Sequence, residues 1–140
     1  MFSFGKSKKS VGFTNGCYDI LHVGHLKLFE YLKNNCDRVI VGIDSDKRVK
    51  QLKGEERPFN NQNDRQFMLQ CLRFVDEVVI FDSEAELEDL VKSIKPQLMV
   101  VGSDYRNKRV VGASFAEKLK FFDKIDGYST TKILQDRPNW

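Results

Sequence analysis

The sequence predicts a doubly wound α/β fold, a parallel sheet with helices on both faces. Short apolar runs alternate with amphipathic stretches along the 140 residues, which is typical of repeated βαβ units. The apolar runs are apolar throughout rather than at every second residue, as expected for strands buried between two helical layers. Ligands bind such sheets at the carboxyl ends of the strands. We therefore expect the functional site just after Thr14, Ile43, Val101 and Ile125.

The first part of the chain predicts a strand, a helix and a second strand. The apolar run at residues 11–14 ends at Asn15-Gly16, a pair that favours a turn. Apolar residues then recur at helical spacing, which predicts a helix over residues 24–34. Residues 38–43 are rich in β-branched side chains and predict the second strand.

The middle of the chain predicts two helices and a third strand. The polar segment 44–61 should be part helix and part loop, because it contains both Gly54 and Pro58. Residues 63–75 predict a full helix and residues 77–81 a strand. One side of that helix should be apolar, formed by Phe67, Met68, Cys71, Leu72 and Val75.

The last part opens with the clearest helical pattern in the chain. Ser83 and Glu86 fit a capping box, and Leu87, Leu90, Val91 and Ile94 follow at helical spacing. A fourth strand is expected at residues 98–101, a helix at 110–119, a fifth strand at 121–125 and a short helix at 129–135.

Composition narrows the class of protein. The length suits one compact domain, residues 1–140, with residues 1–9 as a flexible leader. A net charge of +3 is too small and too dispersed to predict nucleic-acid binding. No apolar stretch reaches the roughly 18 residues that span a bilayer. The three cysteines are too few and too widely spaced for a disulfide framework or a zinc site, which favours a cytoplasmic protein: Cys17, Cys36 and Cys71.

The segment after the first predicted strand carries the strongest chemical signal. It contains both histidines of the chain, in the sequence His22-Val23-Gly24-His25. Gly24 leaves room at a helix start, where free backbone N–H groups and the helix dipole favour a phosphate. Two imidazoles there can donate hydrogen bonds to phosphate oxygens. The alternative is a pair of capping or surface histidines without a ligand, which this position after a strand and turn makes the weaker interpretation.

Four segments in order resemble the HIGH-type nucleotidyltransferase superfamily, in its cytidylyltransferase-like branch. They are residues 15–25, Arg73-Phe74-Val75-Asp76-Glu77-Val78, Gly102-Ser103-Asp104-Tyr105 and Gly127-Tyr128-Ser129-Thr130-Thr131-Lys132-Ile133. The resemblance implies a Rossmann-like fold, a nucleoside triphosphate substrate (ATP or CTP) with Mg²⁺, and transfer of its nucleotidyl group to a phosphorylated sugar or polyol. It also implies a homodimer and contacts with neither nucleic acid nor membrane.

The resemblance assigns roles to particular residues. His22, His25, Lys53 and Arg73 are expected to be catalytic, and Lys50 is the alternative to Lys53, because the family places its lysines loosely in this polar segment. Asp104 is a possible Mg²⁺ ligand. The expected nucleotide-binding residues are Asn15, Gly16, Cys17, Tyr18, Asp19, Gly24, Lys50, Gly102, Asp104, Tyr105, Ser129, Thr130 and Thr131.

Two substrates and one non-catalytic role compete. Residues 49–54 with Arg57-Pro58 resemble the heptose 1-phosphate adenylyltransferases of lipopolysaccharide synthesis, which we prefer. Residues 73–78 and Ser129-Thr130-Thr131 resemble glycerol-3-phosphate cytidylyltransferase. Ser103 departs from both patterns. A nucleotide-binding module that has lost catalysis is the third possibility, which the intact histidines disfavour.

Overall fold

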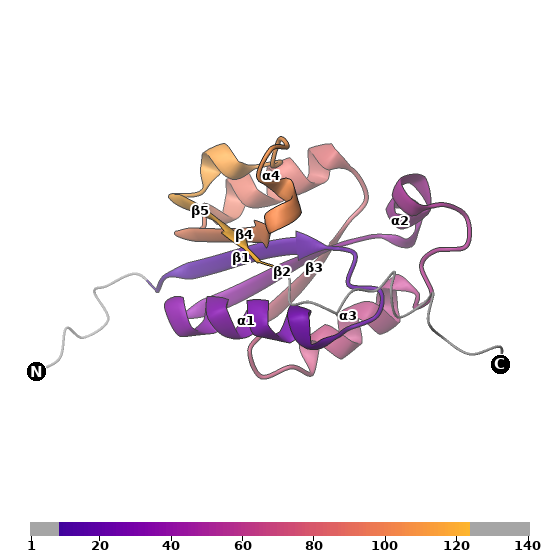
Figure 1. Cartoon of the computed structure of the whole chain (residues 1–140), viewed down its shortest axis with the longest axis horizontal. Helices are drawn as coiled ribbons and strands as arrows, with labels where there is room; N and C mark the ends of the chain where they lie inside the picture. Colours follow the sequence, from indigo (N-terminus) through magenta and orange to yellow (C-terminus); the bar gives the residue numbers. More distant parts are fainter. Residues whose placement is uncertain (1–8, 124–140) are drawn as a thin grey trace, which may run out of the picture.

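The computed structural model describes residues 9–123 and confirms the doubly wound α/β fold. Five strands alternate with four α-helices, and helices lie on both faces of the sheet (Figure 1). The elements are β1 (Val11–Gly16), α1 (Val23–Asn35), β2 (Arg38–Asp44), α2 (Asp46–Lys53), α3 (Gln62–Gln70), β3 (Glu77–Phe81), α4 (Glu84–Ile94), β4 (Leu98–Gly102) and β5 (Lys118–Phe122).

The sheet is parallel throughout, in the order β3-β2-β1-β4-β5. β1 therefore lies at its centre, where Phe13 is in register with Ile40 of β2 and with Met99 of β4. Because the chain leaves β1 toward one side and returns through β4 on the other, the carboxyl end of β1 is the topological switch point. This is the end at which the histidine segment begins.

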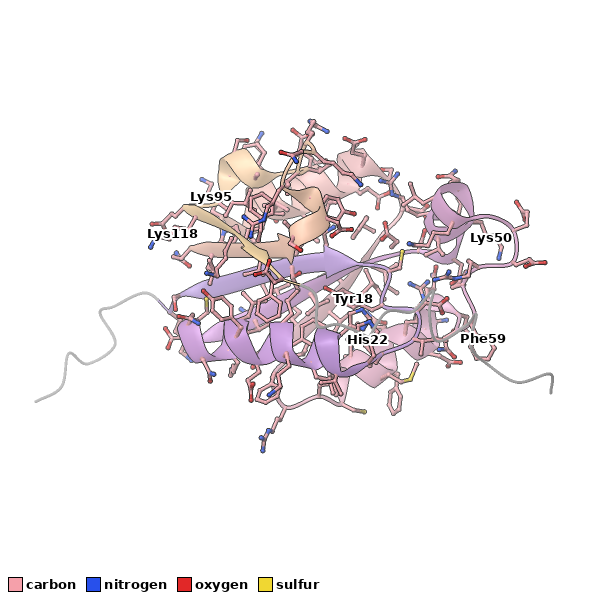
Figure 2. All side chains as sticks on the ribbon, in the orientation of Figure 1. Tyr18, His22, Lys50, Phe59, Lys95 and Lys118 are labelled. Carbon is pink, nitrogen blue, oxygen red and sulfur yellow. The ribbon has the colours of Figure 1, made fainter. Side chains whose placement is uncertain are left out.

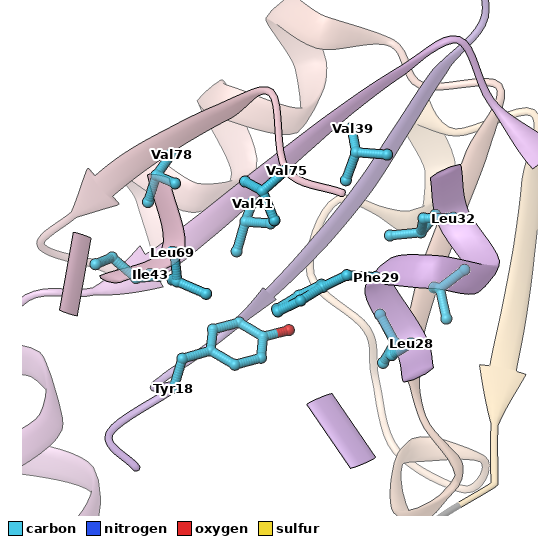
Figure 3. Close-up of a cluster of buried hydrophobic side chains, with 11 residues drawn as sticks. Tyr18, Leu28, Phe29, Leu32, Val39, Val41, Ile43, Leu69, Val75 and Val78 are labelled. Atoms are coloured by element: carbon cyan, nitrogen blue, oxygen red, sulfur yellow. The ribbon is translucent and has the colours of Figure 1, made fainter. Parts of the chain in front are cut away.

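Side chains of the sheet alternate between two buried clusters. On one face, Val39, Val41 and Ile43 pack with the apolar sides of α1 and α3, as Figure 3 shows. On the other face, residues such as Phe13 and Ile40 pack against α4. Burial on both faces explains why the strands lack a polar side.

Most predicted elements are confirmed with small shifts of their ends. One half of the predicted capping box before α4 is observed: the Ser83 hydroxyl accepts a hydrogen bond from the backbone N–H of Glu86 at 3.1 Å. The polar segment contains α2, which ends at Gly54 with a φ of 105°, a conformation that favours glycine. The predicted short helix at residues 129–135 lies outside the described residues, as does most of the expected leader.

The helix predicted over residues 63–75 is shorter and faces differently. α3 ends at Gln70, because the N–H groups of Leu72 and Val75 turn back to carbonyls three residues earlier. Its buried side chains are Arg65 and Leu69, whereas Phe67 is 66% exposed. Of the expected apolar side, Leu72 and Val75 do pack into the core, but they lie beyond the end of α3, and a hydrogen-bonded arginine occupies the buried face of the helix itself.

The helix predicted over residues 110–119 is also wrong. Only one short 3₁₀ turn forms there, Ala113–Phe115, and β5 begins at Lys118. Gly112 precedes the turn with a φ of 82°, and a Cβ at this position would lie 2.7 Å from Val91 of α4. The left-handed glycine breaks the helical path, and the chain re-enters the sheet earlier than expected.

Candidate active site

A cavity of about 540 Å³ lies at the carboxyl ends of β1, β2 and β4. Figure 2 shows Tyr18 and His22 at this end of the sheet, and Lys95 and Lys118 at the opposite end. The structure brings ten of the predicted site residues into the cavity lining: Asn15, Gly16, Cys17, Tyr18, His22, Gly24, His25, Lys53, Gly102 and Tyr105.

The two histidines form the start of α1. Nδ1 of His22 accepts a hydrogen bond from the N–H of Gly24 at 3.1 Å, and Nδ1 of His25 accepts one from the N–H of His22 at 3.4 Å. Together they make a capping box, built here from imidazoles. The rings stack with their centroids 3.7 Å apart. The capping role that we weighed as an alternative is therefore present, and it is compatible with a ligand.

These hydrogen bonds determine which ring nitrogens carry protons. Because both Nδ1 atoms accept, the neutral rings carry their protons on Nε2. Burial, followed by the neighbouring His22, lowers the pKa of His25 to about 3, and burial also lowers the pKa of His22. Both rings are therefore neutral at pH 7, and a hydrogen bond that either ring donates comes from Nε2–H.

The ring of Tyr18 packs against the histidine pair. Its ring is 7% exposed and meets the ring of His25 edge-on, with centroids 5.0 Å apart. Its hydroxyl lies 3.2 Å from the hydroxyl of Thr14. The residue has a φ of 49°, an uncommon value for a bulky side chain. Burial raises the pKa of Tyr18, so its hydroxyl stays protonated. We interpret Tyr18 as a support for His25.

Cys17 lines the cavity, but its thiol is not activated as a nucleophile. Burial, and then the carboxylate of Asp44, raises the pKa of Cys17 to about 12. Its Sγ lies 3.5 Å from Oδ2 of Asp44 as a hydrogen-bond donor. A nucleophilic cysteine needs a lowered pKa, so this environment opposes nucleophilic catalysis by Cys17.

A basic wall, formed by Arg48, Lys53 and Arg57 of α2 and the segment after it, lines the same cavity as the histidines. Lys53 was expected there, whereas Arg48 and Arg57 were missed. Arg109 reaches the cavity from the segment before β5 and pairs with Glu84 at its rim. Arg57 belongs to a segment that resembles the heptose enzymes, but the resemblance assigned it no role. In the sequence, Arg48 and Arg109 look like arginines of any solvated polar segment.

Asp19 lies in the predicted motif but has a different task. Its carboxylate is buried and accepts hydrogen bonds from Nε of Arg57 and from the N–H groups of Phe59 and Asn60, at 3.0, 2.8 and 2.8 Å. With these bonds formed inside the protein, Asp19 holds the segment 57–60 to the loop after β1. The geometry therefore does not support the expected direct contact of Asp19 with the nucleotide.

Arg65 is a second buried connection, and sequence reasoning missed it. Its guanidinium is inaccessible to solvent and donates to the carbonyls of Asn60, Cys17 and Asp44 and to the carboxylate of Asp46. One side chain thereby joins the loop after β1, the end of β2 and the start of α2. No sequence signal marks Arg65 for this role, because most of its partners are backbone carbonyls, which every residue provides.

Besides Asp19, three predicted residues of the described part of the chain do not line the cavity: Lys50, Arg73 and Asp104. Lys50 donates to the carbonyl of Arg57 on the outer side of α2. Arg73 is exposed in the turn before β3, with its guanidinium 5.0 Å from the ring of Phe74. That turn precedes the amino end of a parallel strand, so it lies at the far edge of the sheet from the cavity. Asp104 is exposed beyond β4.

The described part of the chain provides no cage for a metal ion. No group of three or more His, Cys, Asp or Glu residues within residues 9–123 has a suitable arrangement. The expected triphosphate contacts Ser129, Thr130 and Thr131 lie outside the described residues. Within residues 9–123, no helix is long and apolar enough to cross a membrane.

The fold and the site together define a nucleotidyltransferase of the HIGH type. The profile of the cytidylyltransferase-like family matches residues 13–136. The chain belongs to this family, which confirms the resemblance drawn from its motifs.

Known proteins resemble the chain at two levels. It is 49% identical over 129 residues to the bifunctional protein HldE of Campylobacter fetus subsp. fetus (strain 82-40), and 50% identical over 127 residues to that of Aliarcobacter butzleri (strain RM4018). These matches cover 92% and 91% of this chain but only 28% and 26% of the relatives. The chain thus corresponds to about a quarter of their length.

A solved structure shares the fold. The crystal structure of the lipopolysaccharide core biosynthesis protein from Thermoplasma volcanium GSS1 matches with a TM-score of 0.71 at 22% identity. The match covers 85% of this chain and all of the other. At this identity the likeness supports the fold.

Proposed function

We propose that the chain transfers the adenylyl group of ATP to a sugar 1-phosphate of the heptose type and releases pyrophosphate. The observation that carries the proposal is the pair of neutral imidazoles, His22 and His25, whose acceptor nitrogens are occupied by the backbone of α1. The likeness to HldE proteins at 49% and 50% identity supports the adenylyl choice.

The reaction needs charge stabilisation more than a base. An anionic oxygen of the acceptor phosphate attacks the α-phosphorus, the bond to the bridging oxygen breaks, and pyrophosphate leaves with the electron pair. No proton has to be removed from the acceptor. The Nε2–H groups of His22 and His25 donate to oxygens on which negative charge grows, and Lys53 neutralises the α-phosphate. We prefer Lys53 to Lys50 because Lys53 lines the cavity.

Mg²⁺ is part of the proposal as a companion of the triphosphate. This ion commonly retains water and binds through phosphate oxygens with one or two carboxylates. Asp44 is the carboxylate nearest to the site on β2, but it is engaged by Arg48 and Cys17. We therefore assign no step of the reaction to a protein-bound metal. The homodimer expected from the family stays a prediction.

A pyrophosphate-release assay tests the proposal. The protein is incubated with ATP or CTP, Mg²⁺ and a panel of acceptors that includes heptose 1-phosphate and glycerol 3-phosphate. We expect release with ATP and the heptose phosphate. Release only with CTP and glycerol 3-phosphate would contradict the substrate, and no release with any pair would favour a nucleotide-binding module.

Glycerol-3-phosphate cytidylyltransferase is the second candidate. Residues 73–78 are the segment that favoured it, yet Arg73 does not line the cavity. Arg73 was expected to be catalytic with either substrate, so its position does not separate the two candidates. Residues 73–78 and the segment around Ser129 remain resemblances of sequence.

A further inference from the structure

Two arginines of the basic wall are anchored in the same way. Nε of Arg48 donates to Oδ1 of Asp44 at 3.3 Å, and Nε of Arg57 donates to Oδ2 of Asp19 at 3.0 Å. Both side chains line the cavity. Within residues 9–123, Nε is the only nitrogen of either guanidinium with a hydrogen bond to protein. The two terminal nitrogens of each arginine are thus left to meet a ligand.

The anchors are buried carboxylates, which makes both arginines rigid. The side chains of Asp44 and Asp19 are 9% and 0% exposed, and those of Arg48 and Arg57 are 20% and 16% exposed. An arginine held through Nε presents the remaining edge of its planar fork, a shape that matches two oxygens of a phosphate. Surface arginines with solvated partners would lose more side-chain entropy on binding the same ligand.

The position of Arg48 and Arg57 indicates which substrate phosphate they bind. Arg48 and Arg57 lie on the β2 side of β1, whereas Gly102 and Tyr105, the proposed nucleotide contacts, follow β4 on its other side. The histidines at the end of β1 lie between these two groups. In-line displacement requires the attacking and leaving oxygens on opposite sides of the α-phosphorus. With the nucleoside on the β4 side, we take the β2 side as the one from which the acceptor enters; a comparison of the KM values for acceptor and ATP separates this from contact of the two arginines with the leaving pyrophosphate.

We propose that Arg48 and Arg57 form a clamp for the phosphate of the acceptor. The inference rests on the proposed function and deepens it, because it names the residues that recognise the second substrate. Two guanidinium groups that each bind phosphate oxygens select acceptors with a terminal phosphate. The sugar is left to contact other parts of the cavity. Asp44 and Asp19 act as positioning residues for the two guanidinium groups.

Charge-conserving variants test the clamp by steady-state kinetics. Arg48→Lys and Arg57→Lys retain the positive charge but lose the fork. We expect each to raise the KM for the acceptor at least tenfold, and to raise it at least three times more than the KM for ATP. A smaller rise, or an equal rise in the KM for ATP, overturns the proposal.

The matched control is Arg38→Lys. Arg38 is an exposed arginine at the amino end of β2 and pairs with Glu77, so it tests the same substitution at the opposite edge of the sheet. We expect both KM values to stay within twofold of the parent protein. Thermal unfolding of all three variants confirms that each is folded.

A binding experiment separates failure of the clamp from failure of the proposed function. Inorganic phosphate is titrated calorimetrically into the parent protein and into the double variant R48K/R57K, without nucleotide. We expect the dissociation constant to rise at least fivefold in the double variant. This result supports the clamp even if no acceptor yields pyrophosphate. Equal phosphate binding in both proteins, or no binding in either, overturns the clamp even if turnover is normal.

Discussion

Each imidazole of the histidine pair has two roles. Nδ1 accepts a backbone N–H at the start of α1, and in the proposed reaction Nε2–H donates to a substrate oxygen. The first role requires the ring to be neutral, because protonation of Nδ1 removes the acceptor. A positively charged imidazole would therefore be incompatible with this helix start, and in the proposed reaction the transition state would be stabilised by directed hydrogen bonds.

Substitution of His25 separates the two roles. His25→Asn places an amide oxygen where Nδ1 stands and provides no donor at the position of Nε2. We expect kcat to fall at least 100-fold, since a lost donor to a developing oxyanion has this effect, while the free energy of unfolding at pH 8 changes by less than about 1 kcal/mol, the size of a typical capping effect. Steady-state kinetics and urea denaturation measure the two quantities.

His25→Ala is the comparison for that experiment. It removes acceptor and donor together, so we expect the same loss of kcat with an additional destabilisation of about 1 kcal/mol. A kcat for His25→Asn within a few-fold of the parent protein would exclude the assigned role.

Sequence reasoning located the histidines because their type, spacing and place after a strand all agreed. It assigned no role to Arg48 and Arg57, because the carboxylates that hold them become buried partners only in the folded chain. Asp19 lies 38 residues before Arg57, and nothing in the local sequence relates the two. For the same reason the internal partners of Asp19 could not be foreseen; its contact with the nucleotide stays a prediction.

At the scale of elements, the segment between α2 and α3 is held in place by buried charge. Asp19 fixes residues 57–60 from the loop after β1, and Arg65 connects that segment to β2 and α2. The segment carries one arginine of the clamp. Its position therefore depends on two polar groups outside the hydrophobic core.

Removal of the charge of Asp19 tests this connection. In Asp19→Asn an amide nitrogen replaces one acceptor oxygen and faces donors, and Arg57 loses its ionic partner. We expect a destabilisation of about 3–5 kcal/mol, as for other broken buried ion pairs, measured by urea denaturation.

The control is Asp89→Asn, which changes an exposed carboxylate on α4. We expect it to alter the free energy of unfolding by less than about 0.5 kcal/mol. Equal effects of the two substitutions would show that Asp19 does not hold the segment.

The element boundaries show where local patterns suffice and where they fail. The helix after Ser83 was predicted well because cap and apolar spacing agree over its whole length. Residues 118–122 were assigned partly to a helix, although Lys118-Leu119-Lys120 alternates with the period of a strand. The deciding constraint is Gly112, whose contact with Val91 depends on the packing of α4.

At the scale of the whole molecule, His25 links the stability of the fold to pH. Its pKa is about 3 in the folded chain, against an ordinary value of 6.5. Below pH 6.5 the unfolded chain binds a proton that the folded chain does not bind. The stabilising contribution is thus fully present above pH 6.5 and is lost as the pH falls toward 3.

Urea denaturation at pH 8 and at pH 5 measures this linkage. The pKa difference predicts that the free energy of unfolding falls by about 2 kcal/mol over this interval through His25 alone. His25→Asn lacks the titrating ring, so its decrease should be smaller by about that amount. Identical decreases in the two proteins would show that His25 is protonated in the folded state.

The capping box has a consequence for the lifetime of the site. The two donors are held by the first turn of α1, and that turn is in turn closed by the two rings. Fraying of this helix end therefore removes both capping bonds together, because both are made to the same turn. In the proposed reaction, every brief opening of the turn would be an interval without either oriented donor, and refolding of one helical turn would restore both.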